Sequence, residues 1–120
     1  MPINSKQKGA RYEREIAGIL RDHGYDSRRT AQYCGNTGDA SDVVGLPGIH
    51  IECKHQEKLQ IYDWMEQAIR DSGKSGKIPA VFFRKNNCEN LVTLRLEDFL
   101  SIVAEWEAEN VRSQMDKDCN

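Results

Sequence analysis

Three charged side chains in the stretch 38–54 have residue types and a spacing that suit chemistry. Asp42 begins one short β-branched run, and Glu52 and Lys54 close a second run. A separation of two residues places Glu52 and Lys54 on one face of a strand. Carboxylate oxygens are the ligands that Mg²⁺ prefers, and a lysine ammonium is a compact charge that can stand beside a phosphate. The three side chains therefore suit metal-assisted hydrolysis of a phosphodiester.

The two runs, 43–44 and 49–51, flank a Leu-Pro-Gly turn at 46–48, so this stretch predicts a β-hairpin. A three-residue connection would place Asp42 directly opposite Glu52, with their Cβ atoms about 5 Å apart. Like charges in that position destabilise a hairpin unless a cation lies between them. A two-residue turn would put the two acids on opposite faces. The metal-site interpretation depends on this register, and the alternative is a solvated hairpin with ordinary surface charges.

A helix is predicted over residues 5–23, because its apolar residues recur at helical spacing and Gly24 can end it in a left-handed conformation. Glu13 falls in the middle of the apolar stripe of this helix, whereas Glu15 points to the solvent side. A carboxylate that faces inward must be paired, hydrogen-bonded or close to a metal ion. Two interpretations of Glu13 stay open, a buried partner for an arginine and a member of the site.

Two other residues of the second run need an explanation. His50 shares the strand face of Glu52 and Lys54, so a supporting role is one interpretation, and a hydrogen-bonded structural histidine is the favoured one. Cys53 is predicted to pack as a small hydrophobe on the opposite face. The four cysteines lie far apart and form no Cys-x-x-Cys pair, which argues against a zinc site and fits reduced thiols.

The remaining elements must position these side chains. In chain order the predicted helices and strands cover residues 5–23, 25–33, 43–44, 49–51, 61–69, 79–83, 91–95 and 96–106. This order of helix, three strands, helix, two strands and helix predicts an α/β domain with a mixed sheet flanked by helices. The turn-rich loop 34–39 leads into Asp42 and could clamp a phosphate backbone or be a plain connection.

Length and charge limit the classes of protein. A chain of 120 residues suits one domain, predicted over 1–106, and the polar, acidic stretch 107–120 is expected to be a frayed or flexible tail. No apolar run approaches the ~20 residues that span a bilayer, and the N-terminus does not resemble a secretory signal, so an intracellular protein is expected. Residues 1–85 carry 14 Lys and Arg against 11 Asp and Glu, while residues 86–120 carry 3 against 8. A basic face on the first part therefore remains compatible with the net charge of −2.

Phosphate-binding motifs of other enzyme classes are missing from the sequence. There is no Gly-x-Gly-x-x-Gly pattern and no Walker loop, and the Gly-Lys-Ser at 73–75 follows a helix rather than a strand. The set Asp42 with Glu52-Cys53-Lys54 instead resembles the signature of PD-(D/E)XK nucleases. Residues 6–100 are similar to the archaeal-type Holliday junction resolvase family and its bacteriophage relatives.

Further motifs carry the same resemblance. Lys8-Gly9 followed by Glu13-Arg14-Glu15 resembles the first helix of that family, and Ile61-Tyr62 with Glu66-Gln67-Ala68 resembles the helix after the core strands. There are two departures. Ser41 replaces the proline that usually precedes the core aspartate, a change that is expected to matter little. The catalytic-loop serine of the family has no clear counterpart, although Cys34 or Thr37 lies in its neighbourhood.

The resemblance implies a restriction-endonuclease-like fold and a magnesium-dependent DNA endonuclease that cleaves four-way (Holliday) junctions, with Mn²⁺ as a substitute ion. It implies a homodimer in the cytoplasm of a bacterial or phage-infected cell. The implied catalytic residues are Glu13, Asp42, Glu52, Lys54 and Gln67. The implied metal ligands are Asp42, Glu52, the backbone carbonyl of Cys53, and Glu13.

DNA contacts are expected from basic residues in the first part of the chain. They are Lys6, Lys8, Arg11, Arg28, Arg29, Lys58, Arg84 and Lys85. For the dimer, Trp64, Met65, Phe82 and Phe83 have enough apolar surface to form an interface, but a core position is favoured for each. Two alternative functions stay open, namely a PD-(D/E)XK nuclease for a restriction-like or flap substrate and a non-catalytic nucleic-acid-binding module that kept the fold.

Overall fold

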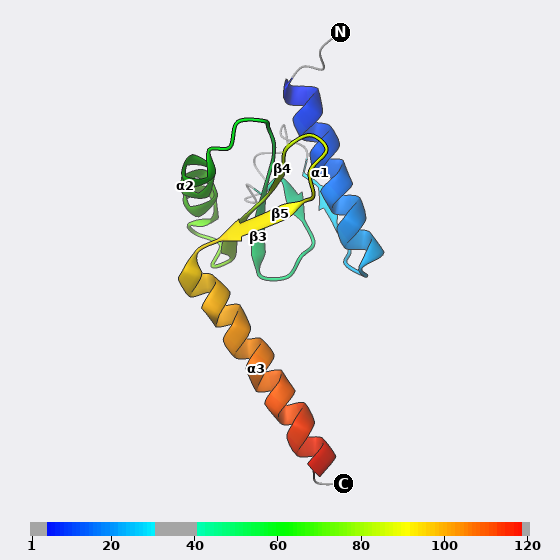
Figure 1. Ribbon diagram of the computed structural model, residues 1–120, viewed down its shortest axis with the longest axis vertical. Helices are drawn as coiled ribbons and strands as arrows, with labels where there is room; N and C mark the ends of the chain where they lie inside the picture. Colours follow the sequence, from blue (N-terminus) through cyan, green and yellow to red (C-terminus); the bar gives the residue numbers. More distant parts are fainter. Residues whose placement is uncertain (1–4, 31–40, 119–120) are drawn as a thin grey trace.

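The computed structural model of this chain describes residues 5–30 and 41–118. Its helices and strands follow the predicted order (Figure 1). They are α1 (Ser5–Asp22), β1 (Arg28–Arg29), β2 (Val43–Val44), β3 (Ile49–His55), α2 (Ile61–Ser72), β4 (Ile78–Arg84), β5 (Leu91–Leu94) and α3 (Leu96–Asp118). Gly24 follows α1 with a φ of 96°, so α1 ends through a left-handed glycine as predicted.

The five strands form one mixed sheet in the order β1-β2-β3-β4-β5. Strands β3 and β4 are parallel, and the other neighbours pair antiparallel. A parallel pair needs a crossover connection, and α2 supplies it between β3 and β4. The predicted α/β class, a mixed central sheet with flanking helices, is confirmed.

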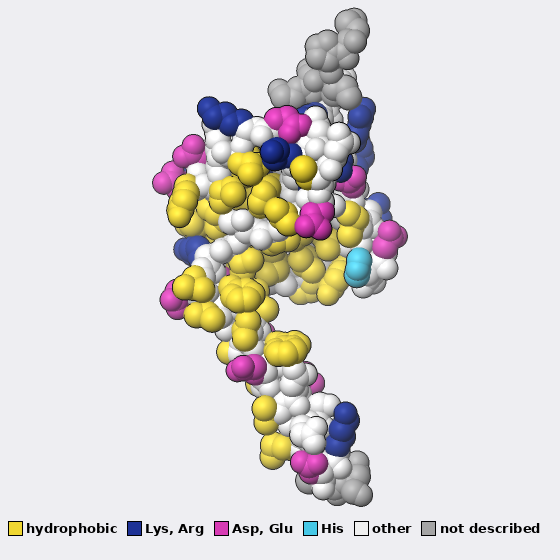
Figure 2. Space-filling model, in the orientation of Figure 1, with side chains coloured by type: hydrophobic (Ala, Val, Ile, Leu, Met, Phe, Trp, Pro, Cys, Tyr) yellow, Lys and Arg dark blue, Asp and Glu magenta, His cyan; other side chains and the backbone are white. Residues whose placement is uncertain are grey.

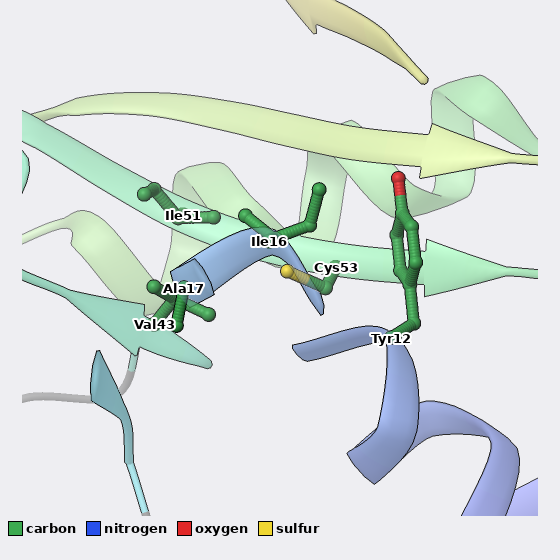
Figure 3. Close-up of a cluster of buried hydrophobic side chains, with 6 residues drawn as sticks. All are labelled: Tyr12, Ile16, Ala17, Val43, Ile51 and Cys53. Atoms are coloured by element: carbon green, nitrogen blue, oxygen red, sulfur yellow. The ribbon is translucent and has the colours of Figure 1, made fainter. Parts of the chain in front are cut away.

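Helix α1 covers one face of the sheet. Its buried side chains meet those of β2 and β3 in a single apolar cluster (Figure 3), which consists of Tyr12, Ile16, Ala17, Val43, Ile51 and Cys53. Cys53 packs in this cluster on the face opposite Glu52, as predicted from the alternation of the strand. This packing fixes which side of β3 faces α1. The even-numbered residues of β3 lie on the other face of the sheet.

Helix α2 covers the opposite face. Trp64, Met65 and Ala68 pack there against Val81 and Phe83 of β4. The ring centroids of Trp64 and Phe83 lie 5.7 Å apart in a tilted arrangement. The larger side chains of this cluster are therefore core residues, and the favoured core position is confirmed for Trp64, Met65 and Phe83.

Helix α3 differs most from expectation. Residues 107–118 continue the helix, so the frayed segment expected from Glu107 onward is wrong for these residues. Polarity alone does not end a helix, and the range 96–118 contains neither Gly nor Pro. None of the α3 residues described is buried, and the helix projects away from the sheet (Figure 1). The boundary at residue 106 between a nuclease domain and a tail stays a prediction.

One predicted segment is described only in part and another not at all. The strand predicted within 25–33 is present as the two residues of β1, and residues 31–40, which include Cys34 and Thr37, lie outside the described part. The expected role of the loop 34–39 therefore stays a prediction. Of the helices that the structure describes, none combines the length and apolar character needed to cross a membrane.

Candidate active site

Asp42 and Glu52 face each other across the β2–β3 hairpin. Val43 pairs with Ile51, and the Asp42 N–H donates to the Ile51 carbonyl over 2.9 Å. The regular pairing is distorted at Asp42, but its side chain still lies close enough to Glu52 for that carboxyl to raise its pKa. The Val43–Ile51 pair is the one predicted for a three-residue connection, and the register of the two-residue alternative is not present at this pair.

The site lies beside the first residue of β2, where β3 continues past it. Strand β2 has two residues and β3 has seven, so within residues 5–30 and 41–118 no strand pairs with the edge of β3 beyond β2. Asp42 closes part of this edge, because its Oδ2 accepts the Cys53 N–H over 2.8 Å. An open cleft of about 260 Å³ forms here, and both α1 and α2 reach it from opposite faces of the sheet. It brings together Glu13, Asp42, Glu52, Cys53, Lys54 and Gln67.

The electrostatics of Asp42 indicate a site for a cation. Burial and, to a smaller extent, the nearby Glu52 carboxyl raise the pKa of Asp42 to about 7, although the Cys53 N–H and Lys54 act in the opposite direction. Two acids forced together in a largely buried place repel each other when both are ionised. A divalent ion between them would remove this repulsion, so the donor set fits Mg²⁺ or a similar hard ion.

Glu13 reaches the same cleft from α1 and is 5% exposed. The Arg29 Nε donates to its Oε2 over 2.5 Å. Burial raises the pKa of Glu13 and nearby Asp42 adds to this, whereas the hydrogen bond from Arg29 lowers it. The two interpretations of Glu13 thus coincide, because it is an arginine partner and lines the cleft. Arg29, expected only as a DNA contact, is the hydrogen-bond partner of Glu13. The hydrophobic pattern of the helix could not have identified this partner.

Lys54 and Gln67 meet across the cleft. The Lys54 Nζ donates to Gln67 Oε1 over 3.0 Å, and Gln67 lies on the flank of α2. A neutral amide oxygen holds the ammonium in place without cancelling its charge. The cleft therefore carries a fixed cation beside the two carboxylates.

His50 lies beneath the cleft and is hydrogen-bonded on both ring nitrogens. Its Nδ1 is 2.9 Å from Ser41 Oγ, and its Nε2 is 2.9 Å from Glu52 Oε1. All three side chains are buried. The favoured interpretation of His50 as a hydrogen-bonded histidine is confirmed. Sequence reasoning missed its partner Ser41, for which the only signal was the position directly before Asp42.

The residues predicted to contact DNA are spread over several elements. Lys6, Lys8 and Arg11 lie on α1, Arg28 and Arg29 form β1, Lys58 follows β3, Arg84 ends β4, and Lys85 comes directly after it. Of these, Lys6 and Arg29 line the cleft. Arg84 is partly engaged elsewhere, since its Nη2 lies 3.5 Å from Glu15 Oε1 and its guanidinium stands over the Tyr12 ring. A role in binding DNA stays a prediction for all eight.

The number of metal-binding side chains is small. Within residues 5–30 and 41–118, no three His, Cys, Asp or Glu side chains converge closely enough to hold an ion by themselves. Mg²⁺ usually keeps several waters and needs only one or two protein carboxylates. The Asp42–Glu52 pair therefore suffices as the protein part of such a site, and Glu13 as a further ligand stays a prediction.

Comparison with known proteins decides the family. Residues 4–118 match the family described as "Phage putative PDDEXK endonuclease". The chain belongs to this family. Among solved structures, a similar fold is that of Archaeoglobus fulgidus Hjc, a Holliday junction resolvase from an archaeal hyperthermophile, with a TM-score of 0.55 and 22% sequence identity over 72% of each chain. No curated protein is similar enough to match the sequence.

Membership of the PDDEXK endonuclease family makes the chain a nuclease, as the resemblance implied. PDDEXK nucleases generally use divalent metal ions such as Mg²⁺, which agrees with the carboxylate pair in the cleft. At 22% identity the likeness to Hjc concerns the fold, and it confirms the predicted restriction-endonuclease-like sheet.

Proposed function

We propose that this PDDEXK nuclease is a magnesium-dependent, structure-selective endonuclease that cleaves four-way DNA junctions, with Mn²⁺ as a substitute ion. The observation that carries the proposal is the Asp42–Glu52 pair beside Lys54 in one open cleft. The likeness of the fold to a Holliday junction resolvase supports the choice of a junction as the substrate. The phage family supports action on DNA in the cytoplasm of an infected cell.

Each cleft residue has a role in this proposal. Asp42, Glu52 and the backbone carbonyl of Cys53 would hold the ion, with Glu13 beside them as a further acid. A bound Mg²⁺ supplies a Lewis acid that neutralises phosphate charge and lowers the pKa of water. Lys54 stabilises the negative charge that develops on the phosphate, because its ammonium lies in the same cleft as the acids.

Two neighbours support these groups. Gln67 fixes the direction of the Lys54 ammonium through their 3.0 Å hydrogen bond. Arg29 holds Glu13 in place and balances part of the negative charge of three neighbouring carboxyl groups. The other basic residues, of which Lys6 also lines the cleft, would contact DNA phosphates. Such contacts do not depend on sequence and weaken as salt concentration rises.

A cleavage assay on three synthetic DNAs tests the proposal. The purified full chain is expected to cut a four-way junction in the presence of Mg²⁺ or Mn²⁺ and to be inactive in EDTA. A linear duplex and a flap of matched sequence are expected to be cut much more slowly. Faster cleavage of the duplex or the flap would assign the site to another substrate, and no metal-dependent hydrolysis of any of the three would overturn the proposed activity.

We also propose that the nuclease acts as a homodimer. The side chains considered for an interface from sequence are mostly buried in the core, and the exposed apolar surface lies elsewhere. Figure 2 shows hydrophobic side chains that continue from the globular part onto α3. The large exposed ones on β5 and α3 are Leu91, Val92, Leu96, Phe99, Leu100, Ile102, Trp106, Val111 and Met115. A continuous apolar surface of this kind is typical of an interface between proteins.

Light scattering after size-exclusion chromatography tests the dimer. The natural chain is expected to elute as a dimer, and Trp106→Glu to shift it to the monomer, because Trp106 is 65% exposed on the apolar face of α3. Ser101→Glu serves as the matched control, since Ser101 is also exposed on α3 but lies away from that face on a helical wheel. A monomeric natural chain, or equal effects of the two variants, would contradict the proposal.

A further inference from the structure

A buried hydrogen-bonded chain connects the two strands that carry the acids. Ser41 directly precedes Asp42, His50 lies two residues before Glu52, and the side chains join in the order Ser41, His50, Glu52. These three residues are 3%, 1% and 1% exposed, so their hydrogen bonds are shielded from solvent. The chain therefore ties the start of β2 to β3 directly beneath the cleft.

The chemistry of the groups sets the direction of each bond. An ionised carboxylate can only accept, so His50 Nε2–H donates to Glu52 Oε1 over 2.9 Å. In a neutral ring the other nitrogen is an acceptor, and the Ser41 hydroxyl donates to Nδ1 over 2.9 Å. The Glu52 carboxylate thus selects the tautomer with the proton on Nε2, and the Ser41 hydroxyl satisfies Nδ1 of that tautomer.

Glu52 needs such support for two reasons. Its side chain has several rotatable bonds, and it lies beside Asp42, whose charge favours rotation of Glu52 away from the cleft. The bond from His50 occupies one carboxylate oxygen within the protein, while Glu52 still lines the cleft. The Glu52 carboxyl also hydrogen-bonds Asp42, and an ion held between the two acids would replace that contact.

We propose that His50 and Ser41 are positioning residues that hold the Glu52 carboxylate in the orientation needed to bind the metal ion. This inference rests on the proposed function, because it assigns Glu52 to the metal site. Partners behind a metal ligand fix its orientation, and their loss typically lowers metal affinity 10- to 100-fold. Ser41 replaces the proline of the family, a change that was expected to matter little. In this proposal the Ser41 hydroxyl helps to orient Glu52 through His50.

Direct calorimetric titration of the full chain with Mn²⁺, in the absence of DNA, tests the inference without relying on cleavage. His50→Leu is expected to weaken Mn²⁺ binding about 10- to 100-fold, since it leaves Glu52 without its donor. His50→Gln is expected to recover most of the affinity, because its amide nitrogen can replace Nε2 as a donor. Ser41→Ala is expected to cause a smaller loss in the same direction.

Ser72→Ala provides the matched control. Ser72 is 5% exposed and its hydroxyl bonds the Ile69 carbonyl within α2, so this variant removes a buried hydroxyl away from the chain of three side chains. It is expected to bind Mn²⁺ as the natural chain does. Circular dichroism establishes whether each variant is folded. If His50→Leu does not fold, the Mn²⁺ affinity of Ser41→Ala alone decides the outcome.

The possible results separate this inference from the proposed function. Unchanged Mn²⁺ affinity in the folded Ser41 and His50 variants would overturn the positioning role even if junctions are cut. An equal loss in Ser72→Ala would overturn it too. Weakened Mn²⁺ binding in a chain that cuts no junction would support the positioning role and overturn only the proposed substrate.

Discussion

Replacing Asp42 by Asn is expected to lower junction cleavage by more than about 100-fold, because even the partners behind a metal ligand are worth 10- to 100-fold. The asparagine Oδ1 can still accept the Cys53 N–H that Asp42 Oδ2 accepts at 2.8 Å, so the hairpin should keep its register. Junction binding in EDTA should survive, since the basic residues are untouched. Single-turnover cleavage and a gel-shift assay measure the two properties, and full activity of the variant would contradict the assignment of Asp42.

The same variant has an expected effect on stability that depends on pH. The pKa of Asp42 is raised to about 7 by burial and by Glu52, whereas it lies near 4 in an unfolded chain. The folded state therefore binds a proton more tightly, and the metal-free protein loses stability as pH rises from about 4 through 7. Asp42→Asn removes this loss and should be the more stable form at pH 8, by at most about 4 kcal/mol.

Urea unfolding in EDTA at pH 5 and pH 8 measures this difference. The natural chain and Asp42→Asn should be closer in stability at pH 5 than at pH 8. Mg²⁺ should raise the melting temperature of the natural chain at pH 8 and leave that of Asp42→Asn nearly unchanged, since a ligand that binds only the folded state stabilises it. Asp116→Asn, a change at an exposed acid of α3, is the control and should follow the natural chain.

Gly45→Ala is expected to destabilise the fold by about 3 kcal/mol or more. Gly45 follows β2 with a φ of 107°, and a Cβ there would overlap the Asp26 carbonyl oxygen and come within 2.6 Å of Ser27 Cα. The cost combines a strained left-handed conformation with a forced separation of β2 from the segment before β1. That segment is tied to β2 by the Ser27 hydroxyl, which donates to the Val44 carbonyl over 2.8 Å.

Gly48→Ala is the matched control in the same hairpin. Gly48 also has a positive φ, 77°, but a Cβ there would meet nothing within 4 Å. Only the conformational cost of about 1–2 kcal/mol remains. Urea unfolding of both variants measures the difference, and equal losses of stability would show that the close approach at Asp26 does not matter.

Local patterns in the sequence were sufficient for the hairpin. The Leu-Pro-Gly turn and the alternation of β3 predict the register that brings Asp42 and Glu52 together, and that register is present. The inward direction of Glu13 also followed from helical periodicity alone. These features depend on residues close together in the chain, where turn geometry and the periods of 2 and 3.6 decide the outcome.

Contacts between distant elements could not be predicted in this way. The pairing of Glu13 with Arg29 depends on how α1 packs over β1, and that of Lys54 with Gln67 depends on the docking of α2. The hydrogen bond between Ser41 and His50 joins the segment just before β2 to β3. Residues 107–118 are helical because the segment lacks helix-breaking residues, whereas the polar composition that favoured disorder does not prevent a helix.

The parts of the cleft differ in how far apart they lie in the chain. Asp42 and Glu52 are only ten residues apart, and closing so short a loop costs little chain entropy and takes microseconds. Glu13 and Gln67 arrive only when α1 and α2 dock on opposite faces of the sheet. The acidic pair that can attract an ion therefore depends on a local turn, whereas the groups that would act on DNA depend on packing between distant parts of the chain.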